Sequence, residues 1–165
     1  PTALRLRRLG VKAIDVGGAE AAAIEIDGIS ASERAEATRM SLGERFRDWG
    51  LPVTVALVGA SAARLPLIAG GVRSGLDAAK ALALGATIVG VGRPLLQTAL
   101  QGERACMDWL ASFELELRTA VFLSGLKRAS DLGRAPVVIT GRTRTWLDQL
   151  AYRRTTTVSR TARPS

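Results

Sequence analysis

The stretch PLIAGGVRSGLDAAKALALGATIVGVGRPLL, residues 66–96, decides the fold. A short apolar run at 66–69 ends in the glycine-rich loop 70–75, and a second run at 86–91 ends in Gly-Arg-Pro. Apolar runs this short, bounded by turn residues, are typical of buried parallel strands. Because the helical pattern of 75–85 lies between them, the stretch predicts two parallel strands joined by a helix.

The sequence on either side extends this pattern. The run VKAIDVGG predicts a third strand at 11–16, and the spacing of apolar residues predicts a long helix over 103–124. The stretch VTVALVGASAARL at 53–65 is ambiguous, because its start favours a strand and its end a helix. Strands that alternate with helices indicate an α/β fold with a parallel sheet. Since a complete eight-stranded barrel needs about 250 residues, the chain is predicted to be a small open domain or part of a larger barrel.

Several local features predict helix ends and side-chain roles. Ser74 is expected to cap the helix that follows it, with Asp77 in the first turn. The helical spacing in SLGERFRDWG predicts a helix over 41–50, and Trp49 is expected in the core. Glu114 and Arg118 are spaced as an i,i+4 ion pair, so Glu114 and the neighbouring Glu116 are assigned a structural role.

Composition excludes several kinds of chemistry within this chain. It has no His and one Cys, so Ser-His-Asp and Cys-His catalysis, histidine-based metal sites and an internal disulfide framework are excluded. A base supplied by this chain would have to be a carboxylate, Lys, Tyr or Cys. No catalytic residue and no metal ligand is therefore assigned.

Charge divides the chain into two parts. The net charge is +8, and residues 152–165 hold four Arg and no acid. We therefore expect a folded domain at 1–150 and a basic, disordered tail at 151–165. Nucleic acid is not an expected partner, since aromatic residues are only 4% of the chain. No membrane span and no signal peptide are recognisable, so a cytoplasmic location is expected.

The two glycine-rich loops are the strongest chemical signal. Each is predicted to follow the carboxyl end of a strand, where backbone N–H groups point outward and glycine lets a phosphate approach closely. Arg73 and Arg93 can add positive charge. The alternative is that the glycines only form tight turns and the arginines are solvated. Asp15, near the end of its strand, is either a catalytic carboxylate or, more simply, a partner for a neighbouring loop.

Five blocks together resemble a known family. VKAIDVGG, FRDWGLPV, the stretch at 66–96, ELRTAVFLSG and PVVITGRTRTWL occur in the order found in the C-terminal part of type 2 isopentenyl-diphosphate isomerases. The resemblance spans nearly all of 1–150 and implies a (β/α)8 (TIM) barrel that binds FMN. It assigns 11–16, 66–69 and 86–91 to barrel strands six, seven and eight, followed by C-terminal helices, and it favours a helix at 53–65.

The same resemblance implies cofactors, a substrate and a binding site. The family uses reduced FMN, made with NADPH, together with Mg²⁺, to interconvert isopentenyl and dimethylallyl diphosphate. The substrate would be an isoprenyl diphosphate, and the chain would act as a homo-oligomer or with a missing N-terminal half. The residues implied to hold the FMN phosphate are Gly70, Gly71, Val72, Arg73, Gly92 and Arg93.

The chain also departs from the family pattern. Glu20, Ala21 and Ala22 stand where the family has Gly-Gly-Thr, so a hydroxyl is lost and a carboxylate is added near the expected phosphate. Ala69 is followed directly by Gly70, one residue fewer than in the family. Segments that match the flavin-ring contacts and the Mg²⁺-binding Gln-Glu pair are absent. We therefore expect a fragment with weak or no FMN binding and no isomerase activity on its own.

Two alternatives remain at this stage. One is another FMN barrel of the 2-hydroxy-acid oxidase type, but that type uses a catalytic His and this chain has none. The other is a non-catalytic, degenerate relic, which the change at residues 20–22 favours.

Overall fold

The computed structural model describes the backbone of residues 2–18, 45–46 and 49–159, and their side chains as far as residue 151. The helix expected at 41–50 and the positions 20–22 therefore lie mostly or wholly outside the described residues. The elements follow in the order α1 (Thr2–Arg8), β1 (Ile14–Val16), α4 (Val53–Ser61), β2 (Leu67–Ala69), α5 (Gly75–Ala83), β3 (Ile88–Val89), α6 (Arg93–Ala99), α7 (Glu103–Leu123), the 3-10 helix η1 (Ala129–Arg134) and α8 (Gly141–Ser159).

The strands form a parallel sheet in the order β1-β2-β3. Ile14 lies opposite Leu67 in the first pair, and Ile68 lies opposite Ile88 in the second. The central strand is buried at both of its ends, with Leu67 only 1% exposed and Ala69 fully buried. The prediction of adjacent parallel strands is confirmed, and with it the α/β class.

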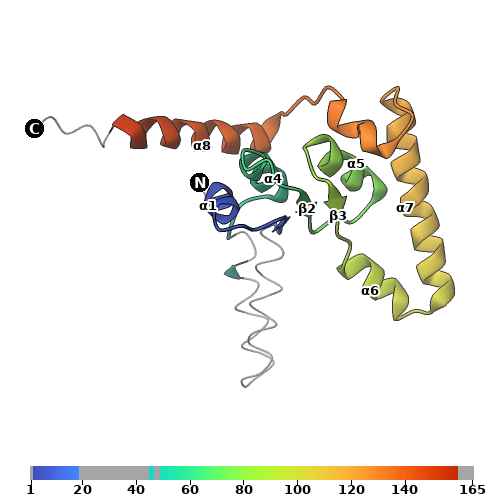
Figure 1. Ribbon diagram of the computed structural model, residues 1–165. Helices are drawn as coiled ribbons and strands as arrows, with labels where there is room; N and C mark the ends of the chain where they lie inside the picture. Colours follow the sequence, from blue (N-terminus) through green and yellow to red (C-terminus); the bar gives the residue numbers. More distant parts are fainter. Residues whose placement is uncertain (1, 19–44, 47–48, 160–165) are drawn as a thin grey trace, which may run out of the picture.

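Helices α4 and α5 cover the sheet on one side (Figure 1). Helix α4 forms although its first residues are β-branched, because Val55, Leu57 and Ala60 are all buried against the neighbouring elements. Helix α5 begins where predicted, since the Ser74 hydroxyl accepts a hydrogen bond from Asp77 N at 3.1 Å. The helix favoured at 53–65 is confirmed.

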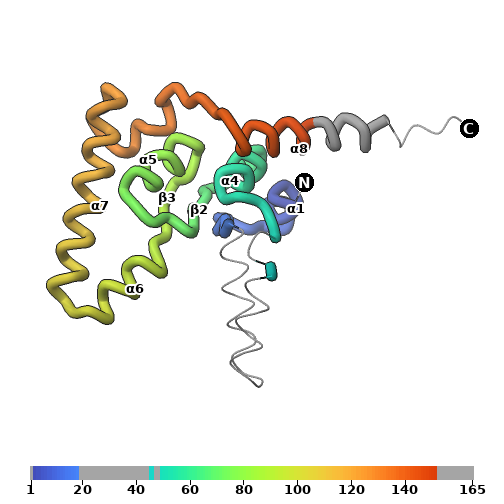
Figure 2. Tube along the Cα trace, turned by 180° about the vertical axis from the view of Figure 1, so that it is seen from behind, coloured from blue at the N-terminus to red at the C-terminus, as the bar shows by residue number. Residues whose placement is uncertain are grey.

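Helix α7 forms an outer layer against α5, as both views of the chain show (Figure 2). Ala79, Val121 and Leu132 make a second buried cluster among α5, α7 and η1. Gly125, with φ +70°, follows the end of α7 in the left-handed conformation that glycine adopts readily. Helix α8 contacts α4 and extends away from the sheet (Figure 1). Within the described ranges, no helix combines the length and apolarity needed to cross a membrane.

Three details differ from the predictions. The strands are shorter than 11–16 and 86–91, because regular pairing covers only the residues that face a neighbouring strand. Trp49 is 71% exposed rather than in the core, and its ring contacts Phe46 among the described residues. Helix α8 runs to Ser159, beyond the domain end expected at residue 150, whereas the disorder expected of the basic tail stays a prediction.

Candidate functional site

The three strands end at the same edge of the sheet, so the loops that follow them begin side by side. Hydrogen bonding continues one residue beyond each pair: Gly70 N donates to Val16 O at 3.1 Å, and Gly90 N donates to Ala69 O at 2.8 Å. The edge formed by the carboxyl ends of parallel strands is where α/β proteins commonly bind ligands. It therefore defines the candidate site.

The first glycine loop, Gly70–Ser74, is anchored at its centre. The Val72 side chain is 4% exposed and belongs to the main core, whereas Gly71 and Arg73 on either side are exposed. Gly71 has φ +73°, a left-handed conformation that an L side chain rarely adopts, and the space beside it is open. The loop thus exposes its backbone to solvent while an apolar anchor fixes its position.

The second glycine loop, Gly90–Arg93, lies against the first. A Cβ placed on Gly90 would lie 3.7 Å from Ala69 O and 3.9 Å from Gly70 Cα. Gly92 and Arg93 are exposed, and Arg93 is the first residue of α6. The two loops that the sequence singled out are therefore neighbours in space, and each carries one exposed arginine.

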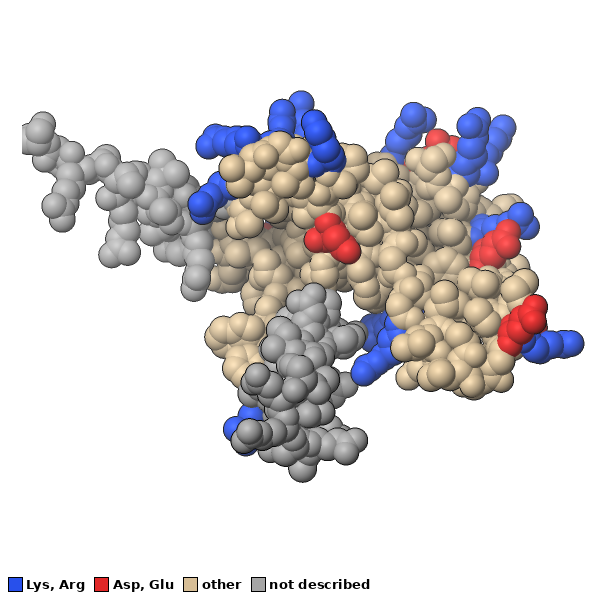
Figure 3. Space-filling model, turned by 60° about the horizontal axis from the view of Figure 1, so that its bottom comes forward, with Lys and Arg blue, Asp and Glu red and all other residues tan. Residues whose placement is uncertain are grey.

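Charge at this edge is mixed. Arg73 Nε lies 4.0 Å from Asp77 Oδ2, and the two side chains are 66% and 38% exposed. Asp15, the middle residue of β1, is exposed, and a Cβ on Gly70 would lie 3.7 Å from its Oδ1 atom. Across the face shown in Figure 3, Lys and Arg are more prominent than Asp and Glu, with broad uncharged areas between them. Exposed pairs of this kind are screened by solvent and stabilise the fold weakly.

A residue of α7 closes the amino end of α5, and sequence reasoning did not find it. Glu116 Oε2 accepts hydrogen bonds from Gly75 N at 2.8 Å and from Leu76 N at 3.4 Å. Glu114, two residues earlier, instead pairs with Arg118 at 3.1 Å as predicted. Because the Ser74 hydroxyl accepts a hydrogen bond from Asp77 N, each of the first three N–H groups of α5 has an acceptor.

Gly75 allows this contact because it lies directly against α7. A Cβ on Gly75 would overlap the carbonyl oxygen of Phe113 and would lie 2.7 Å from Glu116 Cβ. The glycine was predicted as the end of the loop and the start of the helix 75–85. A glycine is needed at this position because α5 and α7 touch there. The residues in contact are about forty positions apart, so local sequence patterns do not show this need.

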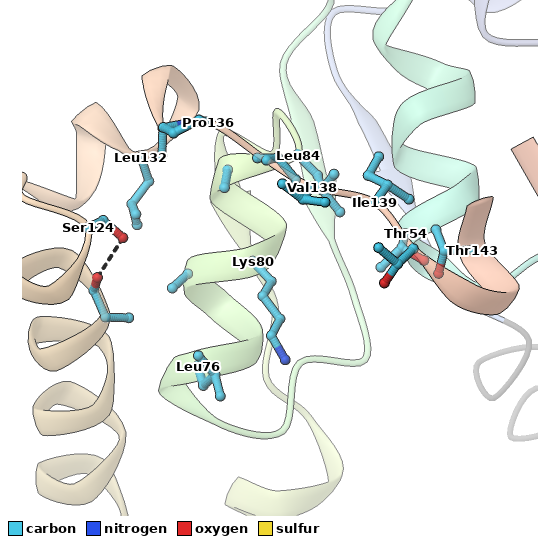
Figure 4. A pocket seen from close by; sticks show the side chains of 16 residues that line it. Thr54, Leu76, Lys80, Leu84, Ser124, Leu132, Pro136, Val138, Ile139 and Thr143 are labelled. Carbon is cyan, nitrogen blue, oxygen red and sulfur yellow. Dashed lines mark hydrogen bonds between the residues drawn. The ribbon is translucent and has the colours of Figure 1, made fainter.

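A groove lies apart from this edge of the sheet. An open groove of about 520 Å³ runs along the outer side of α5 between α4, α7 and the segment at 135–140 (Figure 4). Its lining is mostly apolar, Lys80 is the one ionisable residue, and the Ser124 hydroxyl is already bonded to Ala120 O at 2.8 Å. None of the predicted phosphate-binding residues lines it. In the part of the chain that the structure describes, no three His, Cys, Asp or Glu residues are grouped as metal ligands.

Comparison with known proteins identifies the class. The family model for FMN-dependent dehydrogenases matches residues 50–139, and the chain belongs to this family. Curated relatives named isopentenyl-diphosphate delta-isomerase are similar along most of the chain. The protein from Methanothermobacter thermautotrophicus is 41% identical over 152 residues, which is 91% of this chain and 42% of that protein. Those from Methanosarcina mazei and Thermococcus kodakarensis are each 39% identical.

These comparisons confirm the resemblance to the isomerases. The chain spans about two fifths of the length of the curated relatives it matches. A lactate oxidase structure from Pediococcus acidilactici aligns with a TM-score of 0.61 at 22% identity, covering 85% of this chain and 34% of that one. The fold is accordingly the C-terminal portion of a TIM barrel, with β1, β2 and β3 as strands six to eight.

Proposed function

We propose that this chain supplies the loops that bind the FMN phosphate, and the strands that carry them, in a type 2 isopentenyl-diphosphate isomerase. The observation that carries the proposal is that the two glycine loops lie against each other at the carboxyl edge of the sheet. Similarity of about 40% to proteins named as these isomerases supports the same conclusion. A cytoplasmic location is part of the proposal.

The proposed phosphate ligands differ in what they contribute. Among the described residues, the backbone N–H groups of Gly71 and Val72 have no acceptor, and the proposal gives them to the phosphate. Gly70 supplies space rather than a donor, because its own N–H bonds to Val16 O. Arg73 and Arg93 supply exposed positive charge from the two loops. This set of donors fits a phosphate, since backbone N–H groups and guanidinium groups are its usual partners.

The site leaves the rest of the reaction to other parts of the protein. Reduced FMN, when bound, supplies the flavin chemistry by which this family interconverts isopentenyl and dimethylallyl diphosphate. NADPH, Mg²⁺ and an isoprenyl diphosphate substrate belong to the proposal as well. The residues of this chain bind and orient one end of the cofactor. We accordingly propose that residues 1–165 alone bind FMN weakly or not at all, because phosphate contacts leave the flavin ring unheld. The chain alone would have no isomerase activity, because catalysis needs all the groups held together.

The test is complementation. The chain is incubated with FMN, NADPH, Mg²⁺ and isopentenyl diphosphate, with and without the N-terminal part of a relative, and dimethylallyl diphosphate is measured. We expect turnover only with the added part. In the complemented protein, Arg73→Ala should lower FMN affinity about tenfold or more. Arg104→Ala is the matched control, because Arg104 also forms an exposed i,i+4 pair, at 3.6 Å from Asp108, but lies outside the loops.

Two results would contradict the proposal. Turnover by the chain alone would show that it needs no other part. Complemented activity that is equally insensitive to Arg73→Ala and to Arg104→Ala would remove the first glycine loop from the binding site. The 2-hydroxy-acid oxidase alternative is not favoured, because the relatives that cover most of this chain are named as isomerases.

A further inference from the structure

We propose that Glu116 is a positioning residue for the first glycine loop. It holds the amino end of α5 and so leaves the loop N–H groups, rather than the helix end, to receive a phosphate. The phosphate-directing part of this inference rests on the proposed function, whereas the positioning of the loop does not.

The contact joins two elements that are distant in sequence. Glu116 Oε2 receives both Gly75 N and Leu76 N, at 2.8 and 3.4 Å. Gly75 follows the last residue of the loop, and Val72, three positions before it, is the loop's buried anchor. The loop is therefore fixed at its centre by packing and at its end by a carboxylate from another helix.

Close backbone packing supports this contact. Gly75 is buried, and the absence of a side chain lets the α5 backbone touch the turn of α7 that contains Phe113 and Leu117. Phe113 and Leu117 also pack against the main core. Glu116 is thus presented to α5 by a turn that is itself anchored.

The carboxylate also decides where an anion can bind. The amino end of a helix ordinarily attracts anions through its free N–H groups. Here Glu116 and Ser74 already use the N–H groups of Gly75, Leu76 and Asp77, and a second negative charge at that point would be repelled. Gly71 and Val72, a few residues earlier, keep their donors.

The first arm of the test measures loop order without any ligand. Backbone relaxation by NMR on the full chain compares wild type with Glu116→Ala, and with Glu116→Asp, which keeps the charge but shortens the reach. We expect order parameters at Gly71 and Val72 to fall from about 0.85 to below about 0.6 in both variants. Amide exchange at Gly75 and Leu76 should rise about tenfold. Glu114→Ala is the matched control and should leave these values unchanged.

The second arm titrates inorganic phosphate and follows the amide shifts of Gly71 and Val72. Glu116→Ala should weaken binding about tenfold although it removes a negative charge, and Glu116→Asp should do the same with the charge retained. Glu116→Gln, which can still accept the hydrogen bonds, should stay within about threefold of wild type. A purely electrostatic role predicts tighter binding in Glu116→Ala and no change in Glu116→Asp.

The outcomes separate the two proposals. Loop order in Glu116→Asp equal to that in Glu114→Ala overturns the positioning role, and Glu116→Asp serves this purpose if Glu116→Ala does not fold. Tighter phosphate binding in Glu116→Ala overturns the phosphate-directing role. If wild type shows no phosphate-dependent shift at Gly71 and Val72, the proposed phosphate site is overturned, while loss of loop order in the Glu116 variants still supports positioning.

Discussion

Strands β2 and β3 have similar apolar sequences but different surroundings. Leu67, at the start of β2, is 1% exposed, whereas Ile88, at the start of β3, is 57% exposed. The difference has two causes. Ile88 lies opposite Ile68 and so points to the other face of the sheet from Leu67, and β3 has a paired neighbour on one side only among the described residues, whereas β2 lies between two strands. Apolar composition therefore predicts that a segment is a strand, but its neighbours decide how much of it is buried.

The largest expected effect tests this difference directly. Leu67→Ala should lower the free energy of unfolding by about 2–5 kcal/mol, because it leaves a cavity in the core. Ile88→Ala should cost about 1 kcal/mol or less, since most of the side chain is already in water. Urea unfolding of the two variants measures both values. Equal losses would show that β3 is as buried as β2 in solution.

The contact between α5 and α7 gives the next largest effect. Gly75→Ala should cost about 1–3 kcal/mol, because the new methyl group meets the backbone of α7. Gly59→Ala is the matched control: Gly59 lies within α4, and a Cβ there meets nothing within 4 Å. This control should be stabilising by about 0.5–1 kcal/mol through helix propensity. Thermal melts show whether each variant raises or lowers stability. A stabilising Gly75→Ala would argue against close packing of α5 on α7.

The helix cap between the two strands should have a smaller effect. Ser74→Ala should cost about 1 kcal/mol, because Asp77 N loses its acceptor. Ser112→Ala removes a hydroxyl that donates, among the described residues, to Asp108 O of its own helix, so a change within about 0.5 kcal/mol is expected. Chemical denaturation of both variants provides the measurement, and equal effects would contradict a capping role.

The smallest effect on folding concerns the exposed apolar surface beside β3. We expect the chain to associate with itself or with the N-terminal part of a barrel. Among the described residues, β3 has a paired neighbour on one side only, and apolar side chains such as Leu96, 62% exposed, are uncovered. Leu96→Lys should change stability by about 0.5 kcal/mol or less and reduce association in sedimentation velocity. Gln97→Lys adds the same charge without removing an apolar group. A monodisperse wild-type monomer would contradict the expectation.

Sequence patterns predicted the parts of the molecule that depend on local chemistry. The three strands, the cap at Ser74 and the helix that follows it are all marked by apolar runs, glycine and serine at fixed places. The ambiguity at Val53–Ser61 arose because local propensity favours a strand there, while burial on several sides favours the helix that forms.

The sequence predicted the two loops of the candidate site but not the residue of α7 that supports the first loop. The adjacency of the two glycine loops follows from parallel topology and was predicted, whereas phosphate binding by residues such as Gly71 and Arg93 stays a prediction. The role of Glu116 could not be predicted, because it depends on how closely two helices approach, and Gly75 carries that information only once the helices are placed. Trp49 was misjudged for a similar reason, since helical spacing does not show what covers a side chain.

The segment at 135–140 and the helix after it have a consequence for the order of folding. This segment lines the outer groove together with Thr54, and α8 then contacts α4, which lies some ninety residues earlier in the chain. During synthesis, the β2-α5-β3 unit can form from near neighbours as it emerges, because its contacts are local. The outer surface of α4 is covered only after the last part of the chain has been made. A chain released early would therefore keep its sheet but expose α4 to proteases and chaperones.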